Sequence, residues 1–141
     1  MASSVFLDTH GWIALLNATE QMHGEANSLW QDLGRRRYRI AMTDWVIAET
    51  GNGLARSLAR EQLTEAVERL RANPEHEIVF VDDVLLERSL DFYSRHSDKS
   101  WGLVDCASFI VMQDRGISEA FTSDRHFEQA GFTCLLAGGT S

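Results

Sequence analysis

The chain has 141 residues, of which 44% are hydrophobic and 24% charged, and this balance excludes a disordered or fibrous protein and favours one globular domain. Its two cysteines, Cys106 and Cys134, lack metal-ligand spacing, so we expect reduced thiols rather than a zinc site or a disulfide scaffold. There is no secretory leader or membrane-length apolar run, and the net charge of −8 argues against a uniformly electropositive nucleic-acid binder, so we expect a soluble, cytoplasmic protein.

The first half of the chain is predicted to contain two short strands, each followed by two helices. In chain order these are a strand over 4–7, helices over 9–18 and 23–36, a strand over 39–42, and helices over 45–58 and 60–72. Thr43 or Asp44 can cap the third helix, and Pro74, the only proline, follows the fourth.

The second half continues the alternation of strands and helices. It is predicted to hold a strand over 77–81, helices over 84–96 and 103–115, a strand over 119–122, a helix over 124–130 and a strand over 132–136. Residues 137–141 resemble a frayed tail. The alternation predicts that residues 1–141 form a single α/β domain, in which helices cover both faces of a parallel sheet.

Two aspartates come directly after predicted strands. Asp8 follows the strand over 4–7, and Asp124 follows the strand that ends near Ser123. Ligands of open parallel sheets bind beyond the carboxyl ends of the strands, so we expect both acids at that edge. Each aspartate also precedes a predicted helix, and a purely structural N-cap is the alternative interpretation.

Two further acids lie in apolar surroundings. Asp105 is the only charged residue between Trp101 and Gln113, in a helix that is apolar on nearly every side. A buried carboxylate needs a partner, and the sequence offers no nearby cation except Lys99, so we expect a bound metal ion. Glu49 lies beside an apolar stripe, where a solvent-reaching flank residue is the alternative.

Carboxylates that converge on one edge repel one another unless protons or cations are present. A set of oxygen ligands suits Mg²⁺ or Mn²⁺ rather than zinc. Such an ion can activate water and stabilise charge on a phosphoryl oxygen, so the pattern predicts hydrolysis of a phosphodiester without a side-chain nucleophile.

Four segments, in this order and spacing, resemble the PIN domain family, and within it the VapC-like toxin ribonucleases of type II toxin–antitoxin modules. The matching segments are residues 6–15 (FLDTHGWIAL), 45–50 (WVIAET), 101–109 (WGLVDCASF) and 122–127 (TSDRHF). The resemblance extends over essentially the whole chain and includes the late Ala130-Gly131-Phe132.

The resemblance implies a three-layer α/β/α sandwich with a parallel sheet of about five strands. It also implies a Mg²⁺- or Mn²⁺-dependent endoribonuclease that cleaves single-stranded RNA. Family members are commonly homodimers, and those of the toxin type are silenced by a small antitoxin. The residues that match the family's acidic quartet are Asp8, Glu49, Asp105 and Asp124, and the hydroxyls expected to support them are Thr9 and Ser123.

Other polar and aromatic residues are open to two interpretations. His10 and His126 stand next to the acids and are interpreted as ordinary polar neighbours, with substrate contact as the alternative. Trp101 is either part of the core or a platform for an RNA base. An arginine-rich stretch either binds RNA phosphates or forms a solvated helix end, and it comprises Arg35, Arg36, Arg37 and Arg39.

Several other functions share parts of this pattern. A haloacid-dehalogenase-type phosphatase needs a second aspartate where His10 stands, and a receiver domain needs paired acids and a late lysine, whereas Lys99 is the only lysine. A flap-type DNA nuclease needs DNA-gripping elements for which 141 residues leave little room. A non-catalytic protein-binding module and a stand-alone RNA-processing nuclease remain as alternatives to the toxin.

Overall fold

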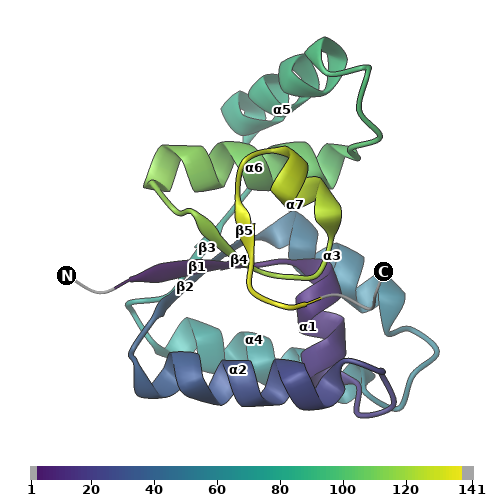
Figure 1. The fold of residues 1–141 in the computed structure, drawn as a ribbon, viewed down its shortest axis with the longest axis vertical. Coiled ribbons are helices and arrows are strands. Elements are labelled where there is room, and N and C mark those ends of the chain that lie inside the picture. Colours follow the sequence, from purple (N-terminus) through teal and green to yellow (C-terminus); the bar gives the residue numbers. More distant parts are fainter. Residues whose placement is uncertain (1–2, 138–141) are drawn as a thin grey trace.

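A parallel five-stranded sheet runs through the centre of the computed structural model, which describes residues 3–137 (Figure 1). The strand order is β3-β2-β1-β4-β5, and every neighbouring pair is parallel. The strands are β1 (Ser4–Leu7), β2 (Arg39–Thr43), β3 (Glu77–Val79), β4 (Glu119–Phe121) and β5 (Thr133–Cys134). The predicted α/β class and parallel sheet are therefore confirmed.

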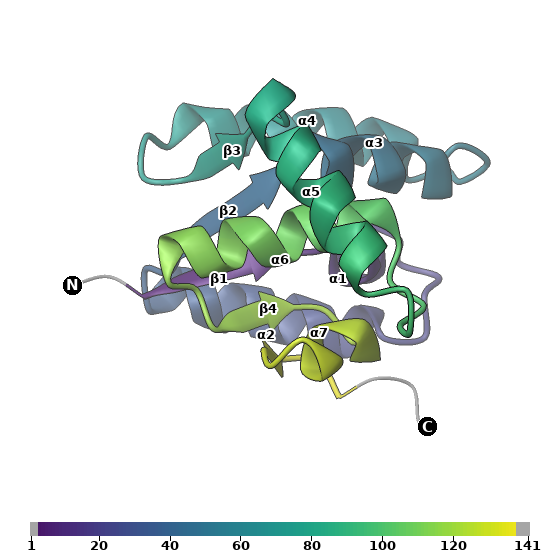
Figure 2. The same cartoon turned by 90° about the horizontal axis from the view of Figure 1, so that it is seen from above.

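Helices cover both faces of the sheet, which gives the expected three layers. The helices α1, α2 and α4 lie on one side, and α5, α6 and α7 lie on the other, with α5 outside α6 (Figures 1 and 2). Their bounds are α1 (Thr9–Leu16), α2 (His23–Arg35), α3 (Asp44–Gly53), α4 (Arg60–Ala72), α5 (Asp83–Arg95), α6 (Leu103–Arg115) and α7 (Arg125–Gln129). Within residues 3–137, none of these helices has the length and hydropathy that a bilayer span requires.

Several predicted elements are longer than the observed ones. The helix predicted over 45–58 ends at Gly53, because two glycines in its last turn weaken the helical backbone. The strands predicted over 77–81 and 132–136 shorten to three and two residues. Both lie at the edges of the sheet, where only one neighbour is available for pairing. Of the predicted tail over 137–141, only Ala137 lies within the described residues.

The core forms where α6 crosses the sheet. Residues 106–112 of this helix are all buried, and so are Val5, Phe6 and Leu7 of β1. The apolar character of α6 on every side, read from the sequence, is thus explained by burial between the sheet and α5. Both cysteines are free thiols, as expected, and burial raises their pKa to about 11, so neither is a reactive thiolate.

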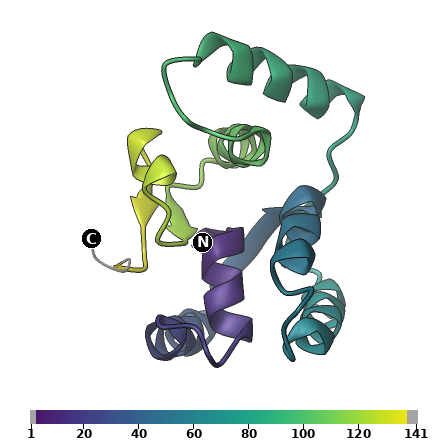
Figure 3. The same ribbon diagram turned by 90° about the vertical axis from the view of Figure 1, so that its right-hand side faces the viewer.

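The strand register aligns the carboxyl ends of the central strands along one edge. Val5 of β1 lies opposite Ile40 of β2, and Leu7 lies opposite Phe121 of β4. The chain leaves this edge into three helices, α1, α3 and α7, which gather there in Figure 3. We call this edge the acidic rim, because the residues that follow β1 and β4 include Asp8 and Asp124.

His76 ties the loop after α4 to the central sheet. The backbone N–H of Ile40 donates a hydrogen bond to Nδ1 of His76 at 3.0 Å, and Ile40 is only 5% exposed. Burial lowers the pKa of His76. A ring nitrogen that accepts a hydrogen bond cannot also carry a proton, so the neutral imidazole is the form that fits the fold.

The His76→Ala variant is expected to be less stable at neutral pH by about 1–3 kcal/mol, because the N–H of Ile40 loses its acceptor. With a pKa below its unfolded value near 6.5, His76 contributes stability above that pH and loses it as the pH falls through 6.5 towards the folded pKa. The difference between wild type and variant should therefore be larger at pH 7.5 than at pH 5 in urea denaturation. A difference that stays constant over this range would contradict the role assigned to His76.

Candidate active site

Asp8 is the most buried acid of the acidic rim, with 2% of its surface exposed. It precedes α1, but its side chain makes no capping hydrogen bond, so the N-cap interpretation fails for this carboxylate. Instead Oδ2 accepts a hydrogen bond of 2.7 Å from the hydroxyl of Thr122, which is itself fully buried. The fold therefore holds the Asp8 carboxylate at the end of β1 with no role in the helix terminus.

Asp124 does cap a helix and faces the rim as well. Its Oδ1 accepts a hydrogen bond of 3.0 Å from the backbone N–H of His126, at the start of α7. Its Oδ2 lies 3.5 Å from Nδ1 of His10. The structural and functional interpretations of this residue are therefore compatible, because they use different oxygens.

Asp105 lies in the first turn of α6 with its side chain 15% exposed. A protein partner that the sequence did not indicate lies beside it, because Nδ1 of His126 is 3.0 Å from its Oδ2. The same oxygen accepts a hydrogen bond of 3.1 Å from the N–H of Gly102. Burial is the main cause that raises the pKa of Asp105; these two hydrogen bonds oppose the rise, and the charges of Asp8 and Asp124 add to it.

Glu49 joins the rim through a threonine. The hydroxyl of Thr9, at the start of α1, donates a hydrogen bond of 2.5 Å to Oε1 of Glu49 on α3. Glu49 is solvent-exposed, as its alternative interpretation stated, yet Thr9 fixes it next to Asp8. Thr9 therefore holds Glu49 through its hydroxyl, and its supporting role in catalysis stays a prediction.

His10 lies between two of the acids. Its Nδ1 is 3.5 Å from Oδ2 of Asp8 and 3.5 Å from Oδ2 of Asp124. The hydrogen bond to Asp8, together with the charges of Asp8, Asp124 and Glu49, raises the pKa of His10 to about 9, against the opposing effect of burial. At neutral pH the imidazole is therefore a cation that offsets the repulsion among the acids. Neither histidine of the rim is an ordinary polar neighbour.

One expected contact is not made at the rim, and Trp101 follows the core interpretation rather than its alternative. Thr122, rather than Ser123, supplies the hydroxyl that supports Asp8, and no hydrogen bond from the Ser123 side chain to an acid is found within residues 3–137. The Thr122 hydroxyl also accepts from the N–H of Asp124 at 3.1 Å, so one side chain supports both acids. Trp101 is 7% exposed and donates through Nε1 to Gln129, so it belongs to the core and is not a free platform for a base.

The arginine-rich stretch lies at the opposite end of the sheet from the acids. Arg39 begins β2 opposite Ser4, at the amino end of β1, and the other three arginines end α2 or follow it. Arg35 and Arg36 form ion pairs with Asp32, and Arg39 pairs with Glu75. The four arginines are therefore not part of the acidic rim, and any RNA contact of theirs lies far from it.

The donor atoms of the rim fit a divalent cation. Asp8 and Asp124 each offer a carboxylate oxygen, and these oxygens and a ring nitrogen of His10 lie within 4.8 Å of one another, although the ring could serve as a ligand only after losing its proton. Asp105, Asp124 and His126 form a second group of the same kind, which shares Asp124 with the first. Acidic residues carried by β1, α6 and the end of β4 thus converge where a metal ion could be held.

Comparison with known proteins identifies the architecture that carries this rim. A model of the PIN domain matches residues 5–133, which is most of the chain. The chain belongs to the PIN domain family. The 23S rRNA-specific endonuclease VapC20 of Mycobacterium tuberculosis, from strains CDC 1551 and H37Rv, is 35% identical over 130 residues, covering 91% of this chain and 95% of the relative.

Solved structures agree with this assignment. This PIN domain matches a crystal structure of M. tuberculosis VapC20, described as a sarcin-ricin loop cleaving toxin, with a TM-score of 0.78 and 29% identity over 92% of this chain and 96% of that one. It also shares its fold with the DNA-bound VapBC complex of Salmonella typhimurium, with a TM-score of 0.59 and 20% identity over 95% and 97% of the two chains. The resemblance to the PIN family read from the sequence is thus confirmed.

Proposed function

We propose that this PIN domain is a Mg²⁺- or Mn²⁺-dependent endoribonuclease that hydrolyses phosphodiester bonds of single-stranded RNA. The observation that carries the proposal is the convergence of Asp8, Asp105 and Asp124 on one edge of the sheet, with Glu49 tethered beside them by Thr9. Carboxylate oxygens are the ligands that these two ions prefer.

Each acid has a separate task in this proposal. Asp8, Asp105 and Asp124 would hold the cation, and Glu49, which is more exposed, would orient water at the solvent side. A bound divalent ion supplies a Lewis acid that activates water and stabilises charge on a phosphoryl oxygen. Thr9 and Thr122 keep the carboxylates in place through their hydroxyls. No protein nucleophile is needed, which agrees with two unreactive thiols.

The relatives suggest a substrate and a biological role. VapC20 is named for cleavage of 23S rRNA, and it is 35% identical to this chain over nearly its whole length. We therefore propose that the chain acts in the cytoplasm on a loop of ribosomal RNA, as the toxin of a toxin–antitoxin pair.

The test is cleavage of purified 23S rRNA by the wild-type chain with Mn²⁺, with Mg²⁺ or with EDTA. We expect cleavage at one or a few sites with either metal and none with EDTA. Because water and not the neighbouring 2′-hydroxyl attacks, the products should carry no 2′,3′-cyclic phosphate. Cleavage that persists in EDTA and leaves cyclic phosphates would contradict the proposal.

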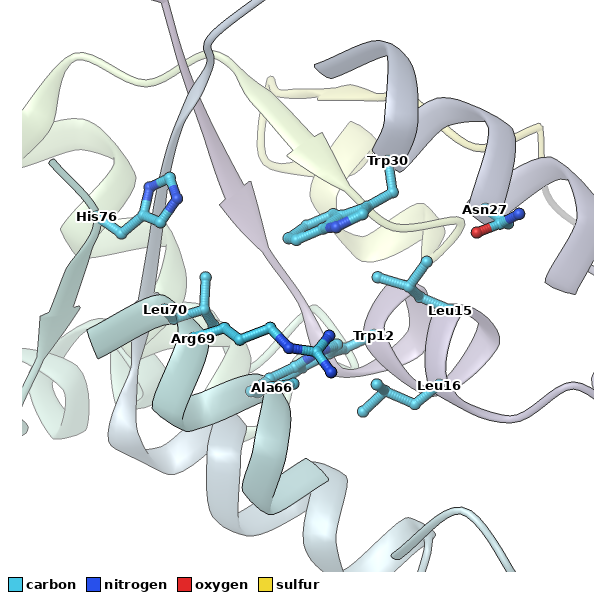
Figure 4. Close-up of a pocket in the computed structure, with 9 residues that line it drawn as sticks. All are labelled: Trp12, Leu15, Leu16, Asn27, Trp30, Ala66, Arg69, Leu70 and His76. Atoms are coloured by element: carbon cyan, nitrogen blue, oxygen red, sulfur yellow. The ribbon is translucent and has the colours of Figure 1, made fainter. Parts of the chain in front are cut away.

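A groove of mixed apolar and polar lining offers a place for the antitoxin. A cavity of about 320 Å³ lies between α1, α2 and α4 (Figure 4). Its lining combines the polar residues Asn27, Arg69 and His76 with the apolar residues Trp12, Leu15, Leu16, Trp30, Ala66 and Leu70. Such a groove fits the apolar face of a partner helix. We propose that the antitoxin docks here.

A second surface lies on α5, where Val84, Leu90 and Tyr93 are exposed apolar side chains. We propose that these residues contribute to a homodimer.

The Ala66→Glu variant should lose the antitoxin while keeping its nuclease activity, because the longer, charged side chain would occupy the groove and pair with Arg69, one turn further along α4. Binding of a candidate VapB-type antitoxin, measured by calorimetry, should weaken at least about 100-fold, a loss of about 2.7 kcal/mol. Thr64→Glu, at an exposed position on the same helix, is the matched control. Equal affinity of the two variants would place the antitoxin elsewhere.

A further inference from the structure

One histidine connects two acids of the rim with the loop between α5 and α6. Nδ1 of His126 lies 3.0 Å from Oδ2 of Asp105, and Nε2 lies 3.2 Å from the hydroxyl of Ser100. The backbone N–H of His126 also donates to Asp124. His126 therefore contacts Asp105 of α6, Asp124 at the start of α7, and the loop residue Ser100.

The chemistry of the neighbours determines which ring nitrogen carries the proton. An ionised carboxylate only accepts hydrogen bonds, so Nδ1 must be the donor towards Asp105. In the neutral ring Nε2 is then an acceptor, and the hydroxyl of Ser100 can donate to it. Trp101, the residue after Ser100, is buried and bonded to Gln129 of α7, which anchors the loop in this position.

This contact also selects the oxygen that Asp105 offers to a cation. Oδ2 accepts from both Gly102 and His126, whereas no hydrogen bond to Oδ1 is found within the described part of the chain. Oδ1 is thereby left as the ligand atom, while Oδ2 is held by the protein. Hydrogen bonds from outside the coordination shell orient ligands in this way and tune metal affinity.

We propose that His126 is a positioning residue of the metal site, which orients the Asp105 carboxylate through its Nδ1–H, and that Ser100 fixes the ring in the required tautomer. The proposal rests on the function proposed above, since it needs a cation at the acidic rim. It extends the site by two residues outside the acidic quartet, one of them in the loop between α5 and α6.

Two amide variants test whether His126 acts through the hydrogen bond from Nδ1 or only by filling space. In His126→Asn the side-chain NH₂ occupies the place of Nδ1 and can still donate to Asp105, whereas in His126→Gln it occupies the place of Nε2. Mn²⁺ affinity of the full chain, measured by electron paramagnetic resonance, should weaken about 10- to 100-fold in His126→Gln and stay within about threefold of wild type in His126→Asn. Ser100→Ala should show a smaller loss than His126→Gln.

Thermal melting in EDTA is the companion measurement, and we expect His126→Asn and His126→Gln to melt alike. Unchanged Mn²⁺ affinity in His126→Gln would overturn the positioning role while leaving the proposed function intact. Equal losses in the two variants would overturn it as well, because the ring itself would then be the ligand. Absence of Mn²⁺ binding by the wild type would overturn both this role and the proposed function.

Discussion

The Asp8→Asn variant is expected to lose at least about 100-fold in the rate of RNA cleavage, the upper end of what loss of an outer-shell partner costs. Asp8 is 2% exposed, so the variant removes the charge of the most buried acid of the rim. The asparagine oxygen can still accept the hydrogen bond from Thr122, so the local fold should be retained. Single-turnover cleavage measures this loss of rate, and Mn²⁺ titration measures the accompanying loss of metal affinity.

The melting temperature in EDTA distinguishes loss of function from loss of the fold. Asp8→Asn should melt close to wild type without metal, because the loss of the ion pair with His10 is offset by the relief of repulsion from Asp105 and Asp124. Asp98→Asn, in an exposed loop position, removes the same charge away from the rim and should cleave like wild type. Wild-type cleavage by Asp8→Asn would remove this residue from the active site.

The Gly11→Ala variant is expected to destabilise the protein by about 3 kcal/mol, at the upper end of the usual range for overpacking. A Cβ atom at Gly11 would lie 2.1 Å from the backbone oxygen of Phe121, so the first turn of α1 must move away from β4. Since the N–H of Asp8 bonds to that same oxygen, the movement should displace the Asp8 carboxylate and weaken Mn²⁺ binding.

The control for this substitution lies in another helix. Gly34 is in α2, and a Cβ there meets nothing within 4 Å, so Gly34→Ala should stabilise the protein by about 0.5–1 kcal/mol through lower backbone entropy in the unfolded chain. Urea denaturation of both variants measures the contrast. Equal stabilities of Gly11→Ala and wild type would show that α1 does not need its close approach to β4.

The order of elements and the shared edge of the acids could be predicted from local patterns. Alternating apolar strands and amphipathic helices imply a parallel sheet, and an acid that follows a strand lies at its carboxyl end whatever the other contacts. This rule alone is enough to place Asp8 and Asp124 at the same edge of the sheet. The edge strands β3 and β5 were predicted too long, because their length depends on pairing with neighbours that the sequence does not specify.

The contacts between distant segments could not be predicted in the same way. The protein partner of Asp105 could not be identified from the sequence, because Lys99 is the only cation close along the chain, whereas His126 reaches Asp105 from α7. Thr122 was missed because its bond to Asp8 joins residues that the sheet alone brings together. The arginines were grouped by composition, and only the strand register shows that they lie at the opposite end of the sheet.

The most direct test of the central claim is RNA cleavage by purified wild type and Asp105→Asn, each assayed with Mn²⁺ and with EDTA. The account predicts cleavage by the wild type with Mn²⁺ alone, and none by a folded Asp105→Asn under either condition. Metal-dependent cleavage by Asp105→Asn at the wild-type rate would contradict it, because the nuclease would then act without the acid of α6.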